Sequence, residues 1–274
     1  PFITPYVLNA ANGQRMLIGG SADLYERTTA AGTFNQLVAP GAGDFTALAY
    51  GHGANANVIF AARSNTLLVR EGAPGTAFRQ HTIGEAGPIL DLVIDPDNAH
   101  VVYATDGRKV FRVEVAPGSI TDACISQNLR DVNLRSLEFV KTGTERMLLA
   151  GGATGVHRAF DPAPNAVWTE FGYGLPNAPV NDIRLIDRAG NAPDLLLVGT
   201  LGRGTWVMQG GSDALFGRPA ILEIEGPAGD DAIEIRYRGT EREIARETEP
   251  ARLWRNSYFL DALLAIARQI RGTK

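Results

Sequence analysis

The sequence predicts an all-β fold built from repeated units of short strands, and three observations lead to this prediction. Short apolar runs recur at intervals of about 40 to 46 residues. A second apolar run that ends in small residues follows each of them, and a third run completes the unit. The first runs lie at 6–10, 45–51, 89–95, 134–140 and 180–186. Three or four strands per unit at this period are typical of radially stacked β-blades, so the predicted fold is a β-propeller with five visible blades.

The five units, here named blades A to E, follow one another along the chain. They span residues 1–43, 44–87, 88–132, 133–178 and 179–218. The first run of each unit alternates little, which is typical of an innermost strand buried on both faces between neighbouring blades. Glycines end second runs at Gly19, Gly151 and Gly199, where a turn needs a positive φ or backbones approach closely. Fourth, outermost strands are predicted at 34–37, 78–83, 120–125 and 167–172.

The pattern changes near Pro219, after the fifth unit. The segments 220–226 and 231–239 alternate apolar and charged residues, which predicts a hairpin with one solvated face. Between about 250 and 271 apolar residues recur at helical spacing, which predicts an amphipathic helix. We therefore expect propeller blades at 1–218, a β-hairpin appendage at 219–246 and a C-terminal helix at 247–274. The helix either covers a face or edge of the propeller, or binds a partner or a second copy.

Composition excludes several classes of function. The 274 residues carry a formal net charge of −4, so no overall positive field favours nucleic acid. No run of 18 apolar residues predicts a membrane-spanning helix. The single cysteine, Cys124, allows no internal disulfide, and the four histidines lie in different units without the short spacing of a zinc site. The sequence shows no nucleophile elbow, phosphate-binding loop or dinucleotide fingerprint.

The stretch 171–208, which reads FGYGLPNAPVNDIRLIDRAGNAPDLLLVGTLGRGTWVM, resembles the closing blade of the Asp-box (BNR) and sortilin-like repeat propellers. The segments 93–112 and 148–159 are similar to middle blades of the same family. The Asp-box itself is poorly kept: 27–35 retains a glycine and a threonine but lacks the aspartate and the tryptophan. The resemblance implies six to eight blades in all and a large exported bacterial protein. Because the chain starts with proline directly before a strand, we expect it to be one piece of such a protein.

An enzyme on this scaffold would place its carboxylates at the mouth of the central channel. Asp44, Asp91 and Asp182 are the candidates, and two of them across the channel could act as acid and nucleophile in glycoside hydrolysis. Asp91 and Asp182, however, recur at the same place in blades C and E. A residue repeated in this way usually serves the repeat, and we expect these aspartates to bond backbone amides of the next blade.

Four residues near the same mouth are candidates for ligand binding: Tyr50, His52, Arg135 and Arg203. A sialidase needs three arginines around its substrate, and no spacing here selects three. Arg203 lies between two glycines, and we expect it to stack on Trp206 or to bind the rim of an adjacent blade. Asp230 and Asp231, at the hairpin turn, are weak calcium candidates, and an ordinary turn is the simpler interpretation. No other cofactor is expected.

These observations predict a non-catalytic structural or recognition module that binds a glycan or a protein. The expected partners are the remainder of the precursor, another protein chain, a second copy or a glycan, in a secreted or cell-surface setting. A partner is expected because an incomplete propeller leaves two apolar blade faces exposed to water. The alternatives are an exo-acting glycoside hydrolase of sialidase or xyloglucanase type, and an assembly factor that holds another protein.

Overall fold

The computed structural model describes residues 4–37, 39, 41–129, 133–171, 175, 178–186, 194–216, 221–225 and 234–238. The chain divides into two compact units, Pro1–Phe216 and Gly217–Lys274. In the second unit, β20 (Ile221–Glu225) and β21 (Glu234–Arg238) pair antiparallel, with Ile224 opposite Ile235. The predicted C-terminal helix at 247–274 and the calcium candidates Asp230 and Asp231 lie outside the described residues.

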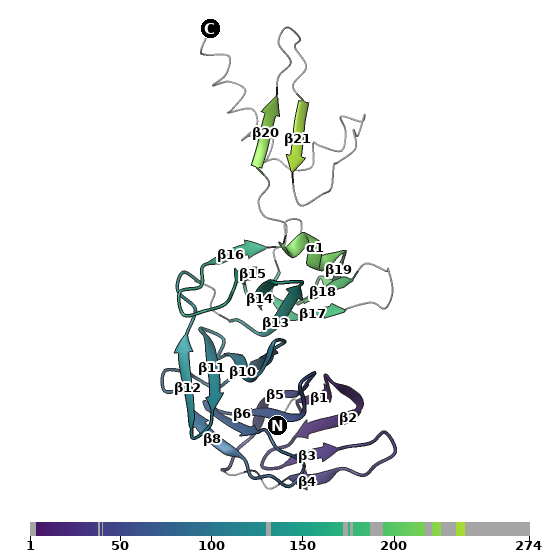
Figure 1. Cartoon of the computed structure of the whole chain (residues 1–274), viewed down its shortest axis with the longest axis vertical. Helices are drawn as coiled ribbons and strands as arrows, with labels where there is room; N and C mark the ends of the chain where they lie inside the picture. Colours follow the sequence, from purple (N-terminus) through teal and green to yellow (C-terminus); the bar gives the residue numbers. More distant parts are fainter. Residues whose placement is uncertain are drawn as a thin grey trace. The chain divides into compact units, whose positions relative to one another are not determined.

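The first unit consists of five antiparallel sheets, each made of strands that are consecutive in the chain (Figure 1). Blade A holds β1 (Tyr6–Asn9), β2 (Asn12–Gly19), β3 (Leu24–Arg27) and β4 (Asn35–Leu37). Blade B holds β5 (Phe45–His52), β6 (Asn55–Arg63), β7 (Thr66–Arg70) and β8 (Arg79–Thr82). Blade C holds β9 (Asp91–Asp95), β10 (Asn98–Thr105), β11 (Val110–Ala116) and β12 (Ser119–Cys124).

Blades D and E complete the series. Blade D holds β13 (Ser136–Thr142), β14 (Glu145–Gly152), β15 (Gly155–Phe160) and β16 (Trp168–Phe171). Blade E holds β17 (Val180–Ile186), β18 (Leu195–Thr200) and β19 (Gly204–Gln209), and is followed by the short helix α1 (Gly211–Phe216), which the sequence analysis did not predict. The predicted five-bladed all-β propeller is confirmed, with a fourth strand in blades A to D.

The innermost strands lie side by side in chain order, so that β1 packs on β5, β5 on β9, β9 on β13 and β13 on β17. Figure 1 shows the blades following one another around this series, from purple through teal to green. The described part of β17 does not pack on β1 in the same way. Within the part of the chain that the structure describes, blades A and E therefore each have a neighbouring blade on one face only.

The core is divided among the joints between blades. One buried apolar cluster joins blades A and B, a second B and C, and a third C and D. The fourth joins blades D and E and includes Leu215 and Phe216 of α1. The second strand of each inner blade is buried on both faces, as in β6 and β14, because a sheet lies against each side. These runs therefore lack the alternation of a half-solvated strand.

Two of the glycines that end second strands sit where the next blade approaches closely. A Cβ at Gly19 would lie 2.6 Å from the Cβ of Phe45, and one at Gly151 would lie 2.6 Å from a methyl carbon of Val180. Neither glycine has a positive φ, so the close approach explains them. Of the two reasons that the sequence offers for these glycines, a positive φ and a close approach of neighbouring backbones, the close approach applies to Gly19 and Gly151.

A buried ion cluster joins blades A and B. The two terminal nitrogens of Arg70, Nη1 and Nη2, each donate to one oxygen of the Glu26 carboxylate at 2.8 Å. Arg15 donates to the same carboxylate at 2.9 Å. The hydroxyl of Tyr50 also donates to Glu26, and Arg15 reaches the amide oxygen of Asn57 at 3.0 Å. These hydrogen bonds, chiefly from Arg70, lower the pKa of Glu26 to about 2 against the effect of its burial.

We expect Glu26→Gln to lower the free energy of unfolding by about 3–5 kcal/mol, because it leaves the fully buried Arg70 without its counter-charge. Urea unfolding near pH 7 measures this. The matched control is Glu114→Gln, which breaks the half-exposed pair of Glu114 with Arg112 and should cost less than about 1 kcal/mol.

The same cluster determines how the unfolding free energy of the wild type changes at acid pH. With its pKa lowered, Glu26 contributes stability that is complete above its unfolded value of 4.5 and is lost as the pH falls toward about 2. Glu26→Gln should lack this loss. Equal losses in the two glutamine variants, or an unchanged acid transition, would contradict a stabilising role for the cluster.

Candidate functional site

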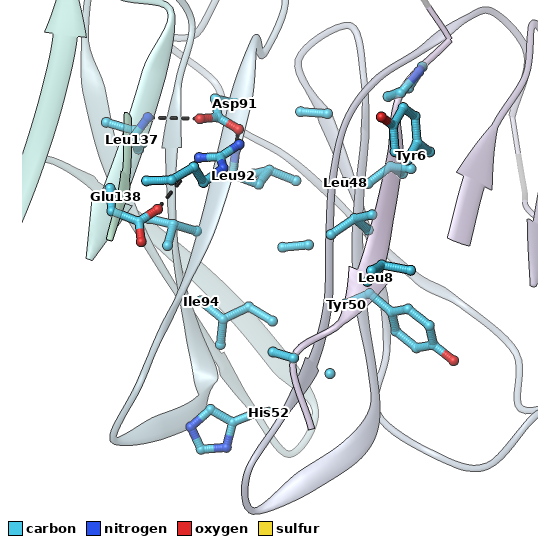
Figure 2. Close-up of a pocket in the computed structure, with 18 of the residues that line it drawn as sticks. Tyr6, Leu8, Leu48, Tyr50, His52, Asp91, Leu92, Ile94, Leu137 and Glu138 are labelled. Carbon is cyan, nitrogen blue, oxygen red and sulfur yellow. Dashed lines mark hydrogen bonds and ion pairs between the residues drawn. The ribbon is translucent and has the colours of Figure 1, made fainter. Parts of the chain in front are cut away.

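A cavity of about 560 Å³ lies along the innermost strands of blades A, B and C. Residues of β1, β5 and β9 form most of its wall, and Leu137, Glu138 and Arg184 from blades D and E close one side. Figure 2 shows Leu48 on one side of the cavity and Asp91, Leu92 and Ile94 on the other, while the ring of Tyr50 points away from them. The cavity thus occupies the channel side of the blades, where the sequence analysis expected a site.

Much of the wall is apolar and reachable from solvent. Tyr6 is 69 % exposed, Leu8 53 % and Leu90 44 %, and all three line the cavity. Tyr6 and Leu8 alternate with the half-buried Val7 on β1, whose other face packs on blade B. An innermost strand with a blade on each side buries such residues, and among the described residues no blade lies on that side of blade A.

The polar side of the cavity is a pair of carboxylates with an arginine. Asp91 accepts hydrogen bonds from its neighbour Leu92 N at 2.9 Å and from Leu137 N of blade D at 2.7 Å, one on each oxygen. Glu138 accepts from Leu185 N of blade E at 3.2 Å and pairs with Arg184 at 3.5 Å (Figure 2). Each carboxylate therefore satisfies a backbone amide of the following blade.

Burial changes how these carboxyl groups ionise. It raises the pKa of Asp91 to about 6, and the Leu137 amide and Arg184 offset this only in part. Burial likewise raises the pKa of Glu138 to about 7, against the opposing effects of Arg184 and the Leu185 amide, with Asp91 and Asp182 adding to the rise. Both groups hold a proton more tightly in the folded chain than in the unfolded one.

The three candidate catalytic aspartates do not converge. Asp91 lies in the cavity wall and makes the contact to the next blade that its repetition predicted. Asp182 lies on β17, where it pairs with Arg184 at 3.1 Å and accepts from the Ser136 hydroxyl at 3.4 Å. Asp44 is exposed just before β5 and does not line the cavity.

Of the four candidate ligand-binding residues, two line the cavity and two do not. Tyr50 and His52 line the cavity, but the Tyr50 hydroxyl donates to Glu26. Burial, together with this bond to Glu26, raises the pKa of Tyr50 to about 12. His52 Nδ1 accepts from Ala54 N at 3.0 Å, so Nε2 carries the proton that it donates to Pro96 O of blade C at 2.9 Å.

The two candidate arginines lie away from the cavity lining. Arg135 donates to Asn181 Oδ1 of blade E at 2.9 Å, and so links two innermost strands. Arg203 is exposed in the turn between β18 and β19. Among the described residues, the arginine–aromatic contacts of the structure do not pair it with Trp206.

Reasoning from the sequence missed Glu138, Arg184, Tyr6 and Leu8. A signal for Glu138 was present, since a glutamate inside a run that is otherwise buried on both faces needs a specific partner. Tyr6 and Leu8 looked like ordinary strand residues, and only the packing of blade A exposes them.

Within the described ranges, His, Cys, Asp and Glu side chains form no group of three or more that could hold a metal ion. No helix there is long and apolar enough to cross a membrane.

The raised pKa values predict how stability changes with pH. An acid whose folded pKa exceeds its unfolded value contributes stability below that unfolded value, and the contribution is lost as the pH rises through the folded pKa. We expect the unfolding free energy of the wild type to fall by about 1–3 kcal/mol between pH 5 and pH 8. In Glu138→Gln this fall should shrink, because the amide does not titrate.

Urea unfolding at several pH values measures the effect, with Glu170→Gln on the exposed part of β16 as the control. A pH profile of Glu138→Gln that overlays the wild-type profile would show that burial of Glu138 is not linked to folding.

Comparison with known proteins supports the fold. No protein-family model matches the chain, and no curated protein matches it either. Among solved structures, the β-propeller domain of Cps50 (Swd1) from Myceliophteria thermophila aligns with a TM-score of 0.57 at 14 % identity. The alignment covers 85 % of this chain and 69 % of that chain. At this identity the likeness establishes the architecture alone: the first unit is a β-propeller domain.

Proposed function

We propose that this protein is a non-catalytic recognition module, and that its central cavity binds an apolar segment of a protein partner. The observation that carries the proposal is the exposed apolar wall formed by Tyr6, Leu8 and Leu90. Large apolar side chains that line a cavity open to solvent are typical of binding sites, because covering them removes apolar surface from water.

The bonding of the carboxylates supports a binding role over a hydrolytic one. Both oxygens of Asp91 accept backbone amides, and Glu138 is held by an amide and by Arg184. A glycosidase needs one carboxyl group free to protonate the leaving oxygen and a second free to attack or to activate water. Here these groups hold neighbouring blades together.

One observation favours a second candidate, the binding of a glycan. Tyr6 is an exposed aromatic side chain at the cavity wall, as a sugar-stacking platform requires. Much of the cavity wall is formed by aliphatic side chains, and its carboxylates Asp91 and Glu138 are already bonded to backbone amides and, for Glu138, to Arg184, so a protein segment fits better.

The relation to Asp-box-type propellers and an exported bacterial setting also belong to this proposal. They are supported by the resemblance of 171–208 and of the middle-blade segments described above. A role as an assembly factor would use the same apolar wall to hold another protein.

Leu8→Asp tests the protein-binding role. We expect peptides selected from a phage-displayed random library on the wild type to bind this variant at least tenfold more weakly, because it places a charge in the apolar wall. Titration calorimetry measures the affinities. Val167→Asp is the matched control, since Val167 is 66 % exposed and lies outside the cavity lining.

A glycan array and a panel of chromogenic glycosides separate the other candidates. Glycan binding that Tyr6→Ala abolishes and Leu8→Asp leaves intact would replace the proposal with the second candidate. Release of sugar that Asp91→Asn abolishes would establish the hydrolase instead.

A further inference from the structure

Blade E differs from the other four blades in its number of strands. Blades A to D each have a fourth, outermost strand, whereas the sheet of blade E is β17–β18–β19. In blades A to D the fourth strand pairs antiparallel with the third, as β8 does with β7 and β16 with β15. Blade E therefore ends on a strand that corresponds to a paired, interior strand elsewhere in the molecule.

The described chain directly after β19 does not pair with the outer edge of this strand. It turns at Gly210, whose N–H donates to Asp194 O at 2.8 Å, and continues into α1. Leu215 and Phe216 of α1 are buried in the apolar cluster between blades D and E, and α1 packs on β18 and β13. Among the described residues, no strand pairs with the outer edge of β19.

Apolar side chains of β19 are more exposed than those of third strands that have a fourth strand beside them. Trp206 and Val207 correspond in register to Leu68 and Val69 of β7, which are each 1 % exposed. In β15 the corresponding residues, His157 and Arg158, are half-buried. In β19, Trp206 is 41 % exposed and Val207 58 %. Trp206 lies opposite Val198 and Val207 opposite Leu197, so the two residues point to opposite faces of the sheet. Both faces of the blade therefore present apolar surface beside the open edge.

This edge also lacks the usual protection. Proteins block exposed edge strands with lysine, proline, bulges or a covering element, because unpaired N–H and C=O groups recruit further strands. The sequence GTWVMQ of β19 contains no charged residue and no proline. Its pairing with β18 runs from Thr200–Gly204 to Leu195–Gln209 without a shift of register.

We infer that β19 is a strand-addition site, at which an extended segment of another polypeptide takes the place of the fourth strand of blade E. The strands β4, β8, β12 and β16 define its geometry: antiparallel to the third strand and three to six residues long. Since Trp206 and Val207 are exposed on opposite faces, the segment carries apolar side chains on both of its faces. Main-chain hydrogen bonds to the edge provide affinity, and the flanking apolar side chains provide selectivity.

This surface is separate from the cavity. None of the cavity-lining residues belongs to β19, and Leu8, which tests the cavity, lies on β1. The inference therefore does not rest on the proposed function, and failure of either one leaves the other standing.

The probe is a capped peptide with the sequence of residues 166–171, AVWTEF, which contains the fourth strand of blade D. Its alternation places valine and phenylalanine on one face and tryptophan on the other, as the inference requires. We expect it to bind the wild type, to slow hydrogen exchange of β19 amides, and to bind Val207→Lys at least tenfold more weakly. Val167→Lys, an exposed valine in another blade, should bind like the wild type.

A peptide with N-methyl groups along the edge-facing positions tests the backbone pairing without changing the protein, and it should not bind. Binding that survives N-methylation, or an absence of both binding and exchange protection in the wild type, would overturn the inference. A dimer that Val207→Lys dissociates would overturn the proposed occupant in favour of a second copy. Light scattering during the same titration distinguishes these results.

Discussion

Each blade of this protein is a thin antiparallel sheet without an apolar layer of its own, so its faces are buried only where another blade lies against them. The four apolar clusters all lie at joints between blades, and no blade holds a core within itself. This constraint explains the uniformly apolar second strands, which have a sheet on each side. It also explains why exposed apolar residues are most numerous on blades A and E, which have one neighbouring blade each within the described residues.

Polar groups at the joints follow a second rule, since a charge taken out of water needs partners there. Glu26 has two arginines and a tyrosine, and Asp91 and Glu138 have amides of the next blade. His52 uses both ring nitrogens on backbone groups, one of them in blade C. These residues look catalytic by type, yet each of them is bonded to groups that align the blades. Under the proposed function, the apolar wall of the cavity is what a partner would contact.

The sequence predicted the architecture because the period of the apolar runs is a direct consequence of the joint constraint. It predicted the contact of Asp91 with an amide of the next blade. Asp182, at the same place in blade E, instead pairs with Arg184 and accepts from Ser136 of the preceding blade. The sequence did not predict Glu138 and Arg184 as partners, because their pairing depends on the stagger between blades D and E. Nor did it predict the exposure of Tyr6 or of Val207. Those side chains are of the same types as buried strand residues elsewhere. They differ because, among the described residues, no sheet lies beside Tyr6 and no fourth strand lies beside Val207.

The ion cluster between blades A and B restricts which blade can occupy the place of blade A. Arg70 and Tyr50 belong to blade B, and the carboxylate that both of them require belongs to blade A. A copy of any other blade placed against blade B would supply apolar contacts but would leave a buried guanidinium uncompensated. The order of modules at this end of the array is therefore encoded by one carboxylate. A duplicated or rearranged blade would be tolerated next to blade B only if it carried a glutamate at the position of Glu26.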